Sequence, residues 1–419
     1  MSPNNAPTLT VVSRSFPPRV SGSAILLANL LANYTGNLKA VAGENRYSEP
    51  DPAFCPPCST QYLAPPSILQ RVYDGLRIRR PALARSLLTT VMGRALKAAG
   101  TDVVLAAFPR EDFLTAAFLA ARRLRLPFYV HMHDLWRDNL TAGTAAARFA
   151  DIWEPVILRQ ATRVLCMTEA MQTHYEKKYG LITELLPHTI PYQAFLRAPR
   201  EMLSPRMSKP TVLFVGAVNP AMNLDALKVL ASASELLPKT YELLYCTSTK
   251  LPSLHQLGIR SSRLRVTYVS RAEVQRLQSE AHVLIAPLSH KNCSMDEVRT
   301  VFSTKLLEYL ISGRPIVVFA PEDSYHAVSA RRQGWAYVVT EDSAAALAAA
   351  IVKVTSDENL AAQLVEGALT EAQSRNAKRH AERLQQWVTT DVADVRVKAS
   401  TKPHGTTNRV IGAENRIIH

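Results

Sequence analysis

Residues 301–318 read VFSTKLLEYLISGRPIVV and combine the signals of a turn, a helix and a buried strand in one short segment. Ser303 or Thr304 can cap the helix, and a glycine stop signal and a proline separate it from an apolar run. Lys305 and Glu308 lie three residues apart, so a helix places both on one face. A helix start beside a lysine suits a diphosphate, and the carboxylate one turn on suits a ribose diol. A surface salt bridge between Lys305 and Glu308 is the alternative.

Short apolar strands alternate with helices in both directions from this segment. Strands are expected at residues 8–13, 102–107, 127–131, 162–167, 184–186, 211–216, 241–246, 264–269, 282–286, 315–319 and 336–339. Continuous apolar strands of this length are typical of a buried parallel sheet. Residues 187–210 contain five prolines, interrupt the series and are expected to be a linker. The sequence therefore predicts an α/β protein with two doubly wound, Rossmann-like domains.

The linker also sets the predicted domain boundaries. They are 1–190 for an N-terminal domain, 191–210 for the linker, 211–375 for a C-terminal domain, 376–395 for a final helix and 396–419 for a basic, disordered tail. Ligands of such sheets bind beyond the carboxyl ends of the strands. The expected site is therefore the cleft between the two domains.

The composition of the 419 residues excludes several classes of protein. Hydrophobic residues make up 47% and charged residues 20%, which is typical of a globular protein and excludes a wholly disordered chain or a coiled coil. No apolar run approaches the roughly 18 residues of a membrane-spanning helix, and Met1–Thr8 lacks a secretion-signal pattern. The five cysteines, an odd number, fit a reducing compartment, so we expect a cytoplasmic protein.

The net charge of +14 favours an acidic partner. Residues 1–200 hold 23 basic and 14 acidic side chains, and basic residues mix with apolar ones over residues 66–100, as in helices that lie on anionic membranes. The basic residues there are Arg71, Arg77, Arg79, Arg80, Arg85, Arg94 and Lys97, and a second cluster contains Arg122, Arg123 and Arg125. We expect an anionic membrane surface as partner, with a solvated basic face as the alternative. Nucleic acid is not expected, because zinc-finger spacing, an RNA-binding aromatic run and a basic zipper are all missing.

Two loops after predicted strands contain further binding candidates. Ser21 and Gly22 open a predicted helix, whose free N–H groups suit a phosphate or sugar hydroxyls, although an ordinary capped turn is the alternative. Gly216 follows the first strand of the second domain and again precedes a helix. No G-x-G-x-x-G pattern is present, which argues against a dinucleotide site.

The H-x-H pattern at His131 and His133 follows a predicted strand and has three readings. The histidines could be metal ligands, although no third ligand is nearby in the sequence. They could instead be a core histidine and a surface histidine. The third reading places an imidazole at the cleft, where it could donate a hydrogen bond to a phosphate or a sugar hydroxyl. Cys55 and Cys58 form an isolated C-x-x-C pair, which does not indicate a structural zinc site.

The segments follow the order and spacing of the family 4-like glycosyltransferases, which the sequence resembles over roughly residues 8–387. Besides residues 303–317, the resemblance rests on P-P-x-x-S-G at 17–22, H-D-L-W at 133–136, C-M-T-E-A-M at 166–171 and F-V-G-A at 214–217. It implies the GT-B fold, in which two Rossmann-like domains face each other across a cleft and the last helix crosses back to the first domain. It also implies transfer of a sugar from a nucleoside-diphosphate donor to an acceptor hydroxyl, with retention at the anomeric carbon. A role in surface polysaccharide or glycolipid synthesis is then expected.

Residue by residue, the resemblance assigns the diphosphate to Lys305 and the turn before it, and the donor ribose to Glu308. His133 is expected to be catalytic, near the donor sugar and its leaving phosphate. With the loop candidates, the residues expected to bind the donor are Ser21, Gly22, Gly216, Ser303, Thr304, Lys305 and Glu308. Neither a metal ion nor a further cofactor is implied. The expected acceptor is lipid-linked or a glycan.

The sequence departs from the family at three positions. Thr300 stands where many relatives carry a glutamate near the donor sugar, and Asp296 and Glu297 are the nearest acids. Val218 and Met222 stand about where relatives carry an arginine and a lysine that bind diphosphate. The alternative functions are therefore a non-catalytic GT-B scaffold that binds a glycan or partner at the membrane, and a sugar-nucleotide epimerase.

Overall fold

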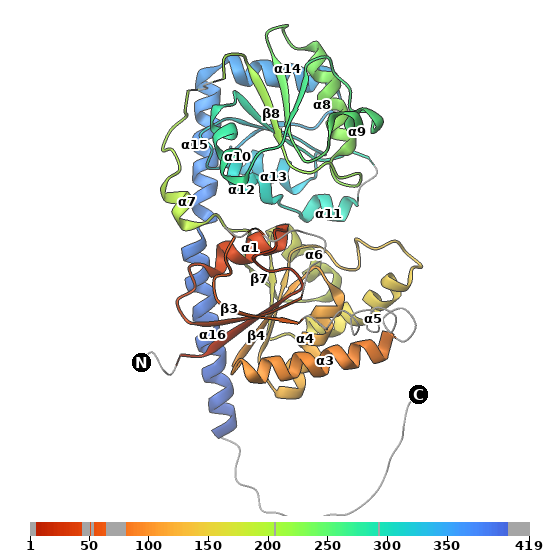
Figure 1. Ribbon diagram of the computed structural model, residues 1–419, viewed down its shortest axis with the longest axis vertical. Coiled ribbons are helices and arrows are strands. Elements are labelled where there is room, and N and C mark those ends of the chain that lie inside the picture. The colour runs from red at the N-terminus through yellow and green to blue at the C-terminus, as the bar shows by residue number, and fades with distance from the viewer. Residues whose placement is uncertain are drawn as a thin grey trace, which may run out of the picture.

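The computed structural model describes residues 6–43, 51, 54–63, 81–204, 207–291 and 294–400, which form two α/β domains stacked along the long axis (Figure 1). Within these residues, the first domain contains a parallel seven-stranded sheet in the order β3-β2-β1-β4-β5-β6-β7. The second contains a parallel six-stranded sheet in the order β10-β9-β8-β11-β12-β13. In each sheet the chain turns back beside its first strand, which confirms the predicted class of two doubly wound domains.

The first domain extends from β1 to β7 and includes the helices that cover its sheet. Its strands are β1 (Thr8–Ser13), β2 (Asn37–Gly43), β3 (Ser59–Leu63), β4 (Val103–Phe108), β5 (Phe128–Met132), β6 (Arg163–Cys166) and β7 (Glu184–Leu185). Its helices are α1 (Gly22–Leu31), α3 (Pro81–Ala98), α4 (Glu111–Leu124), α5 (Ala145–Gln160) and α6 (Glu169–Tyr179). A short helix, α7 (Tyr192–Leu196), then leads into the second domain.

The second domain repeats the arrangement. Its strands are β8 (Thr211–Val215), β9 (Glu242–Cys246), β10 (Leu264–Thr267), β11 (Val283–Pro287), β12 (Ile316–Phe319) and β13 (Tyr337–Val339). Its helices are α8 (Leu224–Leu236), α9 (Leu251–Gln256), α10 (Arg271–Glu280), α11 (Met295–Thr300), α12 (Thr304–Tyr309), α13 (Tyr325–Gln333), α14 (Ala344–Ser356) and α15 (Glu358–Ser374). The last helix, α16 (Ala377–Ser400), returns along the first domain (Figure 1).

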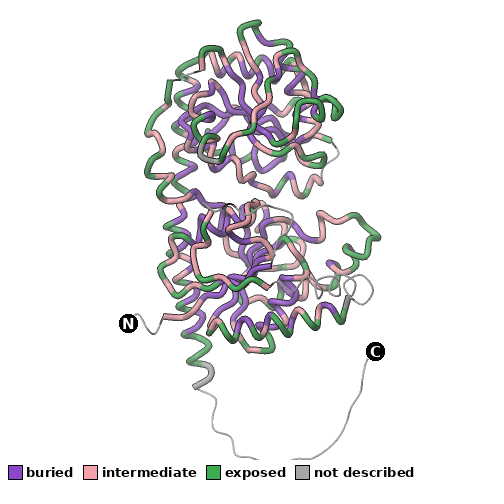
Figure 2. The backbone as a smooth tube through the Cα atoms, in the orientation of Figure 1, coloured by how far each residue is buried: buried purple, intermediate pink, exposed green. Residues whose placement is uncertain are grey.

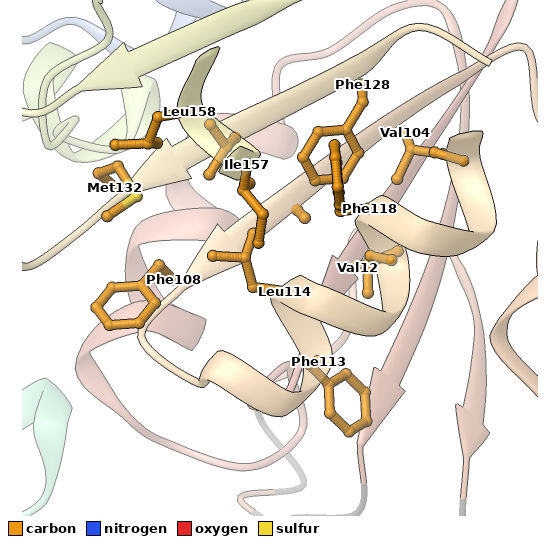
Figure 3. Packing of buried hydrophobic residues seen from close by; sticks show 14 of the residues in the cluster. Val12, Val104, Phe108, Phe113, Leu114, Phe118, Phe128, Met132, Ile157 and Leu158 are labelled. Atoms are coloured by element: carbon orange, nitrogen blue, oxygen red, sulfur yellow. The ribbon is translucent and has the colours of Figure 1, made fainter. Parts of the chain in front are cut away.

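The central strands of both sheets are covered by helices, so their side chains are buried on both faces (Figure 2). In the first domain, α4 lays its apolar face on the sheet, and Phe118 meets Phe128 of β5 edge to face with ring centroids 5.5 Å apart (Figure 3). Complete burial of an aromatic side chain stabilises a fold by roughly 1.5–3 kcal/mol. This continuous burial is why β4 and β8 are apolar runs rather than alternating patterns.

Helix α16 joins the two domains through an apolar stripe. Ala381, Leu384 and Val388 are fully or almost fully buried, and their spacing of three and four residues places them on the face that packs against β1 and α1. The Asp391 carboxylate on the same face accepts hydrogen bonds from Arg163 Nε at 2.8 Å and from the Tyr129 hydroxyl at 2.5 Å. A helix that starts in the second domain is thus anchored in the core of the first.

The chain passes between the domains twice, and the two crossings run side by side. The Ile190 N–H donates to Arg375 O at 2.8 Å, and the Ala377 N–H donates to Ile190 O at 3.1 Å. Two backbone hydrogen bonds therefore connect the outgoing linker to the returning helix.

Several sequence expectations need correction. Residues 396–400, assigned to a disordered tail, continue α16, while 401–419 lie outside the described residues. The linker at 191–210 contains α7, because its prolines leave Tyr192–Leu196 uninterrupted. The edge strands β2 and β3 were not expected, since polar side chains break their apolar pattern.

The anchoring of α16 can be tested by substitution. We expect Asp391→Ala to lower the free energy of unfolding by about 2–3 kcal/mol, because Arg163 and the Tyr129 hydroxyl lose a shared partner. Hydrogen exchange should accelerate in α16. The control is Asp394→Ala, which removes an exposed carboxylate from the same helix. Equal stability of the two variants in chemical denaturation would contradict this account.

Candidate active site

A cavity of about 480 Å³ lies between the carboxyl ends of the two sheets. The first domain contributes the loops that follow β1, β4 and β5, and the second contributes α11, the turn before α12 and Met222. Its lining residues are Ser13, Arg14, Ser15, Ser21, Gly22, Ser23, Leu26, Pro109, Arg110, His133, Asp134, His188, Met222, Glu297, Val301, Phe302, Ser303, Thr304 and Lys305. We refer to it as the first cavity.

Six residues proposed from the sequence meet at this cavity. Ser21, Gly22 and His133 reach it from the first domain, and Ser303, Thr304 and Lys305 reach it from the second. A side chain at Gly22 would come within 4.0 Å of Thr304 Cγ2, so the two loops almost touch here. The Ser21 hydroxyl caps α1 by accepting from the Ala24 N–H at 3.2 Å. Both the candidate phosphate loop and the candidate diphosphate turn therefore face one space.

Gly216 lies behind the cavity and makes room for Lys305. Its φ of 137° is in a region that glycine adopts readily, and a Cβ there would lie 2.9 Å from Lys305 Nζ. Lys305 Nζ sits 4.7 Å from the ring centroid of Phe214, over the aromatic face. Gly216 therefore positions the lysine and does not line the cavity itself.

The Lys305 ammonium makes no ion pair with any described residue, so the salt bridge with Glu308 that was the alternative does not form. Desolvation lowers the pKa of Lys305 to about 8. A positive charge held against an aromatic ring and partly shielded from water is well suited to pair with an anion in the cavity.

Glu308 lies one turn beyond Lys305 on α12 and is not among the residues that line the first cavity. Its carboxylate accepts a hydrogen bond from Gln278 Nε2 at 3.2 Å, and Gln278 is almost completely buried. The donor-ribose role assigned to Glu308 from the resemblance stays a prediction.

At the start of α12, the N–H groups of Thr304 and Lys305 have no acceptor among the described residues, whereas that of Leu306 donates to Ser303 O at 3.0 Å. The Ser303 side chain makes no capping hydrogen bond, contrary to the expected cap, and its backbone N–H donates to His326 Nε2 at 3.0 Å. Burial, with Lys305 and Arg375 nearby, lowers the pKa of His326 to about 3, so this imidazole is neutral and can accept. His326 thereby holds the turn in place from beneath.

His131 and His133 form a chain of neutral imidazoles. The Leu186 carbonyl can only accept, so His131 Nε2, 3.0 Å away, carries the proton. His131 Nδ1 then accepts from His133 Nε2 at 3.1 Å, which leaves His133 Nδ1 as an acceptor. Burial holds the pKa of His133 well below its usual range, with His131 and His188 adding to the effect. His133 is therefore arranged to accept a hydrogen bond from a hydroxyl, whereas the sequence predicted a donor.

A second cavity of about 360 Å³ adjoins the first. The two cavities share Pro109, Asp134, Met222 and Glu297 in their linings. Burial raises the pKa of Asp134 to about 6, and burial with the nearby Asp134 charge raises that of Glu297 to about 7. Two carboxyl groups, one from each domain, therefore stand where the cavities join.

Sequence reasoning did not select Arg14, Arg110, Asp134 or Glu297 as site residues. Asp134 lies in the H-D-L-W motif, and Glu297 was noted only as one of two acids near the departure at Thr300. The structure places Thr300 away from the cavities, where its carbonyl accepts from the Thr168 hydroxyl across the domain boundary at 2.7 Å. Glu297 lies one turn earlier on α11 and faces both cavities.

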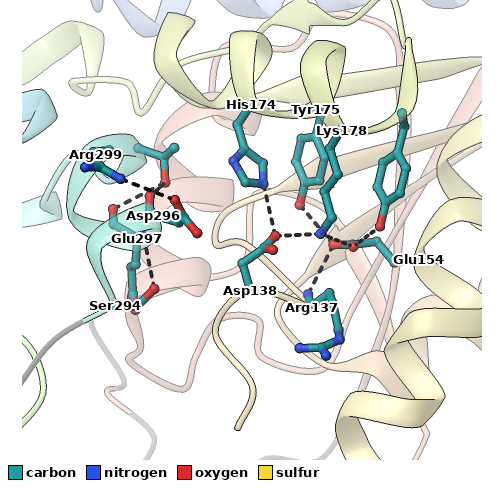
Figure 4. A network of polar contacts seen from close by, with 12 residues as sticks. Arg137, Asp138, Glu154, His174, Tyr175, Lys178, Ser294, Asp296, Glu297 and Arg299 are labelled. Carbon is teal, nitrogen blue, oxygen red and sulfur yellow. Dashed lines mark hydrogen bonds and ion pairs between the residues drawn. The ribbon is translucent and has the colours of Figure 1, made fainter. Parts of the chain in front are cut away.

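A polar network supports the loop that follows His133 and Asp134 (Figure 4). Fully buried Glu154 accepts from the Arg137 N–H at 3.2 Å and from Lys178 Nζ at 3.0 Å. Burial opposes ionisation of Asp138, but hydrogen bonds from His174 and Lys178 lower its pKa to about 2. These contacts fix the segment that forms one wall of the second cavity.

The metal-ligand reading of the H-x-H pattern gains no support from the geometry. The two imidazoles bond to each other, and within the described residues no group of three or more His, Cys, Asp or Glu side chains is arranged to hold an ion. Cys55 and Cys58 are free thiols.

Comparison with known families agrees with this geometry. Residues 48–190 match the glycosyl transferase 4-like domain, and residues 209–357 match the glycosyl transferases group 1. Together the matches span more than half of the chain, in the order of the two structural domains. The protein belongs to the group 1 glycosyltransferases with a 4-like N-terminal domain. A search of curated protein sequences found no significant match.

Solved structures share the GT-B fold over nearly the whole chain. HepE from Anabaena in complex with UDP and glucose aligns with a TM-score of 0.66 at 16% identity, covering 91% of this chain and 99% of that one. Sucrose-phosphate synthase from Thermosynechococcus elongatus aligns with a TM-score of 0.65 at 15% identity, covering 94% and 100%. An α,α-trehalose-phosphate synthase from Burkholderia vietnamiensis gives 0.63 at 12%, covering 93% and 100%. At these identities the likeness shows the fold.

The state of Lys305 can be tested with inorganic pyrophosphate. Its folded-state pKa near 8 means that the ammonium loses its proton as the pH rises through 8. We expect pyrophosphate affinity, measured by calorimetry, to fall by up to about tenfold per pH unit above pH 8. In the Lys305→Arg variant the guanidinium stays charged over this range, and only the titration of pyrophosphate itself remains. The affinity of this variant should therefore change less with pH than that of the wild-type protein. Identical pH dependence in the two proteins would refute this assignment.

Proposed function

We propose that the protein transfers a sugar from a nucleoside-diphosphate donor to an acceptor hydroxyl, with retention at the anomeric carbon. The observation that carries the proposal is the Lys305 ammonium, desolvated and without an ion-pair partner among the described residues, beside a cavity enclosed by both domains. The diphosphate would lie between Lys305, the first N–H groups of α12 and the start of α1. No metal ion is required, since these groups supply the positive charge.

The proposed reaction exchanges one bond at the anomeric carbon for another. The bond from this carbon to the diphosphate oxygen breaks, and its electron pair leaves with the diphosphate. The acceptor oxygen forms the new bond on the same face, and its proton passes to a departing phosphate oxygen. Lys305 stabilises the charge that develops on the leaving group, and His133 accepts a hydrogen bond from a donor-sugar hydroxyl.

Arg14 and Arg110 compensate in this proposal for the missing basic residues at Val218 and Met222. Both arginines line the first cavity from the first domain. Arg14 Cζ lies 5.4 Å from the centroid of the Phe113 ring. The Arg14 side chain fills the space beside Gly43, where a Cβ would lie 2.6 Å from Arg14 Cδ. Positive charge would then reach the diphosphate from both sides of the cleft, so that closure of the domains assembles the site.

A UDP-sugar is the first donor to test, because the HepE structures that share this fold contain UDP and UDP-glucose. We expect one of a panel of UDP-, GDP-, ADP- and dTDP-sugars to be consumed. Lys305→Ala should lower kcat/KM by about 100- to 1,000-fold, and Glu308→Ala should raise the donor KM at least about tenfold. Lys239→Ala, which removes an exposed lysine of the second domain, is the matched control.

The alternatives predict different outcomes in the same assay. A protein that neither binds UDP nor consumes any nucleotide sugar, with Glu308→Ala without effect, would favour a non-catalytic scaffold. Conversion of the donor to an isomeric nucleotide sugar without an acceptor would favour an epimerase.

We further propose that the first domain docks on an anionic membrane and that the acceptor is a lipid-linked sugar or glycan of a surface polysaccharide or glycolipid. Leu83, Leu87 and Val91 form an exposed apolar stripe on α3, with exposed fractions of 51%, 49% and 37%. Arg94 and Lys97 lie on the same exposed face. None of the helices in the described ranges is long and apolar enough to cross a bilayer. An apolar stripe bordered by cations is typical of helices that lie on anionic lipid.

The structure refines the basic surface expected from the sequence. Arg85 is not available to lipid, because its guanidinium lies over Phe149 and Trp153, 4.7 and 5.3 Å from the ring centroids. Arg122 and Arg123 at the end of α4 are exposed. Residues 71, 77, 79 and 80 lie outside the described residues.

Vesicle co-sedimentation tests the membrane proposal. Arg94→Glu/Lys97→Glu should lower partition onto anionic vesicles at least about tenfold at low salt, since each cation near the surface contributes about 1 kcal/mol. Leu87→Glu should weaken binding as well, whereas Leu236→Glu, at an exposed site on α8 of the second domain, should not. Equal binding to neutral and anionic vesicles, or no binding to either, would overturn the proposal.

A further inference from the structure

The two adjoining cavities differ in the charge of their linings. Arg14, Arg110 and Lys305 line the first cavity, whereas none of the described residues that line the second is basic. The second is lined by three carboxyl groups, from Glu111, Asp134 and Glu297, and two of them, Asp134 and Glu297, also line the first. The charge of the linings should therefore make an anionic ligand favour the first cavity and its neutral analogue the second.

Three of the polar side chains that line the second cavity, those of Asp134, Asn139 and Glu297, have oxygens that can accept hydrogen bonds from hydroxyls. Among the described residues, none donates a hydrogen bond to the carboxylates of Asp134 or Glu297. Asn139 Oδ1 is buried and has no hydrogen-bond partner there either. Buried oxygen acceptors without partners cost free energy, and sugar hydroxyls are donors that would satisfy them.

The remaining wall of the cavity is apolar. Phe108 and Trp136 pack with ring centroids 5.5 Å apart, and Leu135 and Leu140 continue their surface. Such a wall can cover the C–H face of a sugar ring. A cation site does not fit, because the acidic side chains of the described residues nowhere form a metal-binding group. The volume of about 360 Å³ is within the range of small-molecule sites.

We infer that the second cavity binds an uncharged sugar unit of the acceptor, and that it rejects acceptors that carry a phosphate or carboxylate near the reacting hydroxyl. The inference rests on the proposed function and specifies its acceptor. The hydroxyls of the sugar donate to Asp134, Glu297 and Asn139. Because Asp134 and Glu297 also line the first cavity, the acceptor hydroxyl lies at the junction, next to the anomeric carbon of the donor.

The test compares matched sugars on the protein loaded with saturating UDP, which keeps phosphates out of the first cavity. Binding of the methyl glycosides of glucose, galactose, mannose and N-acetylglucosamine, and of their 6-phosphates, is measured by calorimetry and saturation-transfer NMR. At least one neutral glycoside should bind about tenfold or more tightly than its 6-phosphate, since like charges across an interface cost several kcal/mol. UDP binding is measured in the same samples.

Two variants sharpen the comparison. Glu111→Lys should reduce the preference for the neutral sugar at least about threefold, because it replaces a negative charge with a positive one at an exposed position. The control, Glu358→Lys, makes the same change in the first turn of α15, far from the site. Asn139→Ala should weaken the neutral sugar without loss of stability, since its Oδ1 has no partner to lose in the described structure.

The possible failures are distinguishable. Loss of UDP binding would contradict the proposed function itself. With UDP bound, the inference is overturned if the 6-phosphates bind as tightly as the neutral sugars, if no neutral glycoside binds, or if Glu111→Lys and Glu358→Lys behave alike. It is also overturned if methyl glucosaminide, a cation, binds more than tenfold more tightly than the glucoside.

Discussion

The rest of the molecule depends on one constraint: the carboxyl-terminal ends of the two parallel sheets face each other. In each domain the loops that follow the strands lie together at the carboxyl-terminal end of the sheet, because the strands run in the same direction. Neither set of loops alone encloses a ligand. Helix α16 keeps the two ends facing each other by burying Leu384 and Val388 in the first domain and by pairing Asp391 with Arg163. The first cavity, with walls from both domains, exists because of that anchoring.

Direct contacts across the cleft add to this arrangement. The Thr168 hydroxyl at the start of α6 donates to the Thr300 carbonyl, and Glu169 accepts from the Tyr325 hydroxyl and pairs with Arg332 at 3.5 Å. The exposed Glu169–Arg332 pair contributes little stability by itself, whereas the Thr168–Thr300 hydrogen bond is buried.

Desolvation gives the site its electrostatic character. It makes the Lys305 ammonium easier to deprotonate and keeps His131, His133 and His326 neutral. It also makes Glu297 easier to protonate. The positive charge is thereby concentrated in the first cavity and the carboxyl groups at the junction and in the second. This separation follows the direction of the proposed transfer, from an anionic donor to a hydroxyl acceptor.

Local patterns in the sequence determined the two doubly wound domains, the linker between them and six of the residues at the first cavity. Apolar runs such as Thr211–Val215 and helix signals such as those around Lys305 act between neighbours in the chain, so they can be read without the fold. Edge strands escaped detection because the polar residues of β3 face solvent and carry no apolar pattern.

Tertiary structure alone decided which charges face one another. Glu297 rather than Thr300 faces the cleft because α11 packs through Thr300 against α6, more than 100 residues earlier in the chain. The proton position on His133 depends on the Leu186 carbonyl, and Lys305 has no ion-pair partner in the described structure because Gly216 and Phe214 accommodate it. Sequence spacing cannot encode these contacts, because burial and partnership are set by segments that meet only in the folded chain.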